Sequence, residues 1–162
     1  MRRAHIVSLI ALIVAVPAAA TASYFGTNSK SSGTKPCFIA GTAGYELSDA
    51  KSARHVIRID NATATPSLRM QLVDNPAQAD FVLVDDADTA GTCKGAASIE
   101  SIRLDPTAAR PELTVALSRA PADYKIFVRS AHYSDEDAAA LFAVMWHKAE
   151  TTGSIRSPAT RD

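Results

Sequence analysis

The chain has 162 residues, enough for one domain of ordinary size. Hydrophobic residues make up 47% and charged residues 21%, which is typical of a globular protein and excludes a largely disordered chain. The only charges before Cys37 are four basic residues, so the remainder carries 13 basic and 17 acidic groups, a net of 13 − 17 = −4. Binding to nucleic acid requires many basic groups against the phosphates, so we expect no nucleic-acid partner.

The first 25 residues predict an N-terminal helix that serves as a signal peptide or as a membrane anchor. Arg2 and Arg3 precede an apolar run, and Ala20-Thr-Ala22 is typical of a signal-peptide cleavage site. The stretch 6–25 also has about the ~20 residues of a membrane span, which allows membrane contact through these residues. Both alternatives place the rest of the chain outside the cytoplasmic membrane, in the periplasm or the extracellular space. Residues 26–36 are polar and predict a flexible linker.

Short apolar runs predict an α+β domain over residues 37–150. Some runs alternate apolar and polar residues, as half-buried strands do, and Phe81–Val84 is apolar on both faces, as a central strand is. The connections between runs are short, which favours antiparallel neighbours. We therefore expect a mostly antiparallel sheet of about six short strands, with Gly41-Thr-Ala-Gly44 as a turn. The runs are Cys37–Ala40, Val56–Ile59, Leu68–Leu72, Phe81–Val84, Ser98–Leu104, Leu113–Ser118 and Tyr124–Ser130.

A C-terminal helix is expected to pack on one face of this sheet. Ser134 and Asp137 form a capping-box pattern, and apolar residues then recur at helical spacing. Trp146 lies outside this apolar stripe, so either both sides of the helix are covered or an aromatic patch is exposed. The exposed patch would be an interaction surface, with Phe127, His132 and Trp146 as its candidate residues. Residues 151–162 are expected to form a disordered tail.

The two cysteines, Cys37 and Cys93, predict a disulfide, because thiols oxidise outside the cytoplasm and an even number suggests a bridge. A bridge between them would stabilise the fold by roughly 3–4 kcal/mol in the chain-entropy model. The alternatives are two free thiols or a redox pair, although the C-x-x-C spacing of a redox pair is absent.

Chemistry-bearing residues are few. Asp85, Asp86 and Asp88 are weak candidates for a metal, because the closing glutamate of a calcium loop is missing. His132 can be drawn into a triad with Asp85 and Ser130, but the chain has no G-x-S-x-G, H-E-x-x-H or cysteine–histidine zinc pattern. We therefore expect no catalytic residues and no cofactor.

The sequence thus predicts an exported, non-catalytic accessory or protein-interaction domain at the outer side of the cytoplasmic membrane. Another envelope protein is its expected partner. One alternative is a small-ligand or metal-binding periplasmic domain that uses the loop of Asp85, Asp86 and Asp88. The other is a membrane-anchored subunit of a larger complex.

Overall fold

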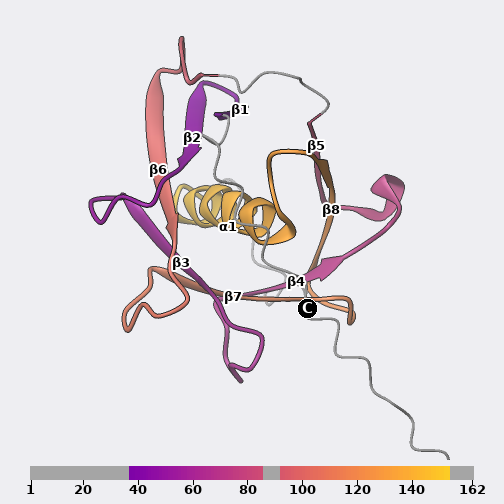
Figure 1. Ribbon diagram of the computed structural model, residues 1–162. Coiled ribbons are helices and arrows are strands. Elements are labelled where there is room, and N and C mark those ends of the chain that lie inside the picture. Colours follow the sequence, from indigo (N-terminus) through magenta and orange to yellow (C-terminus); the bar gives the residue numbers. More distant parts are fainter. Residues whose placement is uncertain (1–36, 86–91, 154–162) are drawn as a thin grey trace, which may run out of the picture. The chain divides into compact units, whose positions relative to one another are not determined.

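The computed structural model describes residues 37–85 and 92–153, all within a compact unit that spans residues 31–162. These residues form one sheet of eight strands and one α-helix (Figure 1). The expected N-terminal helix, the linker and most of the expected tail lie outside the described residues. The elements are β1 (Phe38–Ala40), β2 (Ala43–Leu47), β3 (His55–Ile59), β4 (Leu68–Leu72), the 3₁₀-helix η1 (Pro76–Gln78), β5 (Phe81–Asp85), β6 (Ser98–Leu104), β7 (Leu113–Ser118), β8 (Tyr124–Ser130) and α1 (Asp135–Thr151).

The sheet is almost entirely parallel. Its strand order is β1-β2-β6-β3-β7-β4-β8-β5, and only the β1–β2 pair is antiparallel. The expectation of a mostly antiparallel sheet of about six strands is therefore wrong. It rested on the short connections, which are five to eight residues long within each run of consecutive parallel strands. A parallel crossover normally needs a dozen or more residues.

Staggered pairing removes the need for a crossover. The first part of β6 pairs with β2 (Ser98 opposite Ala43), and its last part pairs with β3 (Ile102 opposite His55). Each later strand likewise bridges two strands from the other half of the chain. In each half of the chain, every strand therefore lies farther along the sheet than the strand before it, in the same direction. A short loop is enough for each step.

The sheet curls into a half-barrel around α1. Figure 1 shows the strands following one another around the helix. Phe38 of edge strand β1 and Phe81 of the opposite edge strand β5 approach each other, with ring centroids 5.9 Å apart. The ring of Phe81 also contacts that of Phe142 in α1, with the two ring centroids 5.4 Å apart. Aromatic side chains therefore connect the two edges of the sheet to the helix between them.

The helix begins where the sequence predicted it. The side chain of Ser134 accepts a hydrogen bond from the backbone N–H of Asp137, and the Asp137 side chain accepts one from the N–H of Ser134. This capping box satisfies two donors that helix geometry leaves unpaired. Three consecutive alanines, Ala138, Ala139 and Ala140, are fully buried. Three consecutive positions face different sides of a helix, so α1 is enclosed on more than one side.

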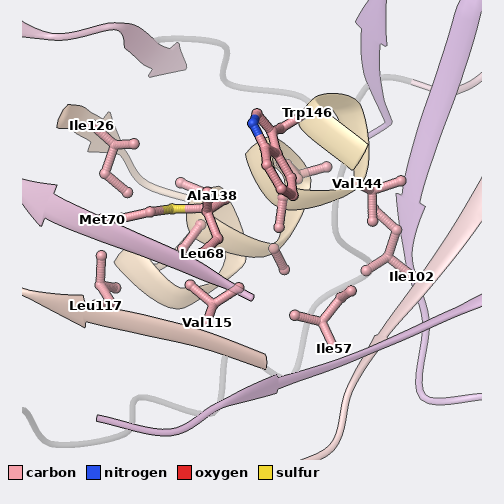
Figure 2. Packing of buried hydrophobic residues seen from close by; sticks show 14 of the residues in the cluster. Ile57, Leu68, Met70, Ile102, Val115, Leu117, Ile126, Ala138, Val144 and Trp146 are labelled. Atoms are coloured by element: carbon pink, nitrogen blue, oxygen red, sulfur yellow. The ribbon is translucent and has the colours of Figure 1, made fainter. Parts of the chain in front are cut away.

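The core lies between the inner face of the sheet and α1. Alternate residues of the central strands, including Ile57, Met70, Val115 and Ile126, point toward the helix and are fully buried (Figure 2). Each such side chain contributes roughly 1.5–3 kcal/mol of hydrophobic stabilisation. The intervening residues of each strand point away from α1, onto the outer face of the sheet.

Candidate functional site

Asp85, Ser130 and His132, the residues of the candidate triad, do meet in the structure. Asp85 ends β5 and lies opposite Ser130, which ends β8. Oδ2 of Asp85 accepts a hydrogen bond from Oγ of Ser130 at 2.9 Å and lies 2.6 Å from Nδ1 of His132. The parallel register of the two edge strands brings the three side chains together.

The hydrogen bonds among these residues are not those of a catalytic triad. In a triad the serine hydroxyl donates to the histidine ring, whereas Ser130 donates to Asp85. Oγ of Ser130 also accepts the backbone N–H groups of His132 at 3.0 Å and Tyr133 at 2.9 Å. The hydroxyl is thus held by three partners and closes the turn between β8 and α1. We call the side chains of Asp85, Ser130 and His132 the turn clamp.

Tyr133 closes the same turn from the inside. Its side chain is buried, and burial raises the pKa of its hydroxyl well above the ordinary value; the nearby carboxylates Asp85 and Asp137 raise the pKa further. The phenol therefore stays protonated at neutral pH.

The expected metal loop has one described member. Asp85 is engaged in the turn clamp, and Asp86 and Asp88 lie outside the described residues. Across residues 37–85 and 92–153, no three His, Cys, Asp or Glu side chains are grouped so that they could hold a metal ion.

Sequence reasoning missed a buried carboxylate. Glu100 lies on the inner face of β6, and its side chain is only 5% exposed. Its oxygens are 2.8 Å from Nζ of Lys148, 3.2 Å from a guanidinium nitrogen of Arg54 and 3.3 Å from Nε2 of His55. The hydrogen bond from Lys148 is the main cause that lowers the pKa of Glu100, and burial opposes it.

A second carboxylate extends this cluster. Nδ1 of His55 lies 2.8 Å from Oε2 of Glu112, whose other oxygen is 3.7 Å from Nε2 of His147. The cluster therefore joins the last turns of α1 to the start of β3, to β6 and to the residue before β7. One feature of the sequence could have indicated this cluster: Glu100 occupies an inward position of a predicted strand. A buried carboxylate requires a charged partner, so such a position predicts a nearby cation. Several cations hold Glu100, so the arrangement fits a structural charge cluster.

The Cys37–Cys93 disulfide is present, with its Cα atoms 5.2 Å apart. It lies over Gly44 in β2, where a Cβ atom would be only 2.7 Å from Sγ of Cys93. The expectation that Gly41-Thr-Ala-Gly44 forms a single turn is right for Gly41 and wrong for Gly44. Gly41 does turn the chain, with φ +62, whereas Gly44 belongs to a strand that the disulfide covers.

The three candidate interaction residues do not share one surface. Trp146 is 8% exposed, and its indole N–H donates to the hydroxyl of Tyr124 at 2.8 Å inside the half-barrel (Figure 2). Phe127 lies on the outer face, opposite Val82 of β5. His132 is held in the turn clamp.

No family model, curated protein or solved structure matches the chain. Of the helices in the described residues, none is both long and apolar enough to cross a membrane.

Proposed function

We propose that this chain is an exported, non-catalytic interaction domain that binds another envelope protein at the outer side of the cytoplasmic membrane. The observation that carries the proposal is the uncovered outer face of the sheet. All-parallel sheets occur almost only with both faces covered, and here every described strand pair except β1–β2 is parallel. Here α1 fills the inner face, and within the described residues no helix packs on the outer one. A partner protein is the natural cover.

Two further observations support the proposal. The Cys37–Cys93 disulfide is compatible with an oxidising compartment, in agreement with the export features of residues 1–25. The hydroxyl of Ser130 donates to Asp85 and accepts backbone N–H groups, so it does not donate to the imidazole ring of His132 as a triad serine would.

Site-specific photo-crosslinking in cells that make the full chain tests the proposal. Ala116 is the central outward residue of β7 and is the position to label. Lys51, an exposed loop residue, is the matched control position. We expect one discrete crosslinked envelope protein from position 116 and none from position 51.

Two results would contradict the proposal. One is an absence of crosslinks from every outward position of β3, β7 and β4. The other is a hydrolase activity of the purified chain that disappears in His132→Ala while the fold is retained.

A further inference from the structure

The uncovered outer face carries a charge opposite to that of the domain. Five basic residues occupy outward strand positions: Arg58, Arg69, Arg103, Lys125 and Arg129. The outward positions of β3, β4, β6, β7 and β8 include no acidic residue. The domain from Cys37 onward has a net charge of 13 − 17 = −4, and Glu46 of β2 is the one acidic residue at an outward strand position in the described residues. We call these five residues and the outward residues of β7 the basic face.

The register arranges the basic face around β7. Arg58 of β3 lies opposite Thr114, and Arg69 of β4 lies opposite Ala116. Both partners belong to β7, whose outward residues are small. Lys125 of β8 follows one strand beyond Arg69, opposite Gln71. An extended segment laid along β7 would therefore have cations on both sides and little steric obstruction beneath it.

Several of these cations have binding capacity to spare. Arg69 and Lys125 are exposed, and neither forms an ion pair with any residue in 37–85 or 92–153. Arg103 pairs with Asp105 at 2.7 Å, and Arg58 lies 3.7 Å from Asp60. The Nε atoms of both arginines are nevertheless buried without an acceptor in the described residues. A ligand at the surface cannot reach these enclosed atoms, so Arg69 and Lys125 are the cations that are best placed to bind it.

From this arrangement we infer that the partner presents an extended, acidic protein segment that lies along β7 on the basic face. This inference deepens the proposed function by naming the chemistry of the partner. Opposite charges on the two surfaces select the partner and speed its association. Phe127 and the exposed Val82 at the adjacent edge add apolar contact area, as protein interfaces combine arginine with apolar side chains.

Two other polyanions fit less well. The sheet wraps around α1, so its outer face is convex. A flat lipid surface would therefore contact only part of the width of the basic face. Nucleic acid would also experience the net charge of −4 on the domain as a whole. A short acidic segment that lies along β7 contacts the cations of the neighbouring strands without having to span the curve of the sheet.

Binding of fluorescein-labelled decaglutamate to the purified full chain tests the inference by fluorescence anisotropy. We expect binding that weakens as salt is added, because the contacts are exposed charges. Arg69→Glu/Lys125→Glu should lower the affinity by roughly tenfold or more. The matched control Lys51→Glu/Lys94→Glu reverses two exposed loop lysines and should stay within about twofold of the wild type. Circular dichroism verifies that both variants keep the fold.

The inference is overturned if decaglutamate does not bind, or if both double variants bind it equally. Stronger binding to phosphatidylglycerol vesicles or to oligo(dT) than to decaglutamate also overturns it, in favour of lipid or nucleic acid. If crosslinks from position 116 persist in Arg69→Glu/Lys125→Glu, the proposed function stands and the acidic partner is wrong. If decaglutamate binds as expected but no crosslink forms in cells, the proposed function fails by itself.

Discussion

Glu100 is a charged residue in a place that the strand pattern reserves for apolar ones. Its neighbours on the inner face of β6, Ile102 and Leu104, contribute to the core, and Ile102 is fully buried. A carboxylate without partners there would cost several kcal/mol of desolvation. Lys148 and Arg54 offset this cost while keeping part of their own side chains in water, with 48% and 67% exposed. In each of these ion pairs the carboxylate is therefore buried, whereas the cation remains partly in contact with water.

The lowered pKa of Glu100 predicts how stability changes in acid. The folded protein holds this proton less tightly than the unfolded chain, so stability rises with pH between the lowered pKa and the ordinary value of 4.5. The contribution is complete above pH 4.5 and is lost as the pH falls through the lowered pKa. We expect Glu100→Gln to be less stable than the wild type at pH 7, with a difference that shrinks in acid. Urea unfolding of both proteins across this range measures the difference, and a constant difference would contradict the assignment.

Ser130 supports a second prediction, because its hydroxyl closes the turn before α1. Ser130→Ala leaves two backbone N–H groups and Asp85 without that partner. By analogy with the loss of a helix cap, we expect a loss of about 1–2 kcal/mol in the free energy of unfolding. Ser98→Ala, at an exposed strand serine, is the control and should change stability by less than about 0.5 kcal/mol. Equal effects in urea unfolding would show that the turn clamp is not structural.

At this scale the sequence supplied the residues of the turn clamp but not its hydrogen bonds. The strand pattern predicts that Asp85 and Ser130 lie at strand ends and that His132 lies in the adjoining turn. Whether a hydroxyl donates to a carboxylate or to an imidazole depends on shifts of a few ångströms in the turn. No residue pattern encodes such shifts.

Among the elements, β2 shows how a covalent bond decides where a strand lies. Gly44 was expected in a turn, but it lies in a strand. A glycine is needed there because a larger residue cannot fit beneath the disulfide. β2 carries Tyr45 into the core and pairs with β6, the strand that follows Cys93. The missing side chain therefore reflects packing against sulfur and not backbone freedom.

Gly44→Ala should therefore be destabilising because of the sulfur atoms above it. Its Cβ would be 2.7 Å from Sγ of Cys93 and 3.2 Å from Sγ of Cys37. We expect a loss of about 1–3 kcal/mol in the disulfide-bonded protein, as for overpacked cores. In a Cys37→Ala/Cys93→Ala background both sulfur atoms are gone and only Ala96 Cβ, at 3.1 Å, stays close, so the loss should be smaller. A double-mutant cycle from thermal unfolding measures the coupling, and its absence would refute the steric explanation.

Seven of the eight described strands could be predicted from apolar runs and alternation, β2 being the exception, whereas their partners could not. Leu113–Ser118 and Tyr124–Ser130 match β7 and β8 in the structure. Each contacts strands from the first half of the chain instead of its sequence neighbour. Short loops normally indicate hairpins, and nothing local distinguishes a hairpin from a forward step along a curled sheet.

On the scale of the whole molecule, two halves of the chain form one sheet by alternating. Parallel partners are separated by 45 residues (Phe81 opposite Ile126) to 56 residues (Ile57 opposite Leu113). Among the described strands, only β1 and β2 pair locally. Neither half can build its part of the sheet alone, and because the paired segments are far apart in the sequence we expect slow folding.

The interleaving predicts complementation between fragments. A peptide of residues 37–85 has its parallel partners in the second half, so it should be unfolded alone by circular dichroism. A second peptide of residues 92–153 should be equally disordered. Mixing them under oxidising conditions should restore β-structure and join them through the Cys37–Cys93 bond. Cooperative thermal unfolding of the first peptide alone would contradict this arrangement.

Whole-chain composition could exclude a disordered protein but not a basic surface. The negative total is an average, and it concealed Arg58, Arg69 and Lys125 on one side of the sheet. Strand alternation alone would have revealed this separation if applied to charges as well as to apolar residues.

Under the alternative in which residues 1–25 anchor the chain in a membrane, the disulfide has a mechanical consequence. A pull on the chain before Cys37 is transmitted through sulfur to Cys93 as well as along the backbone to β1. Cys93 leads into β6, whose two parts pair in parallel with β2 and β3. Tension directed along that strand loads many interstrand bonds in shear at once, a geometry that withstands force better than peeling them apart singly. The covalent bridge thus spares a three-residue edge strand from carrying the load alone.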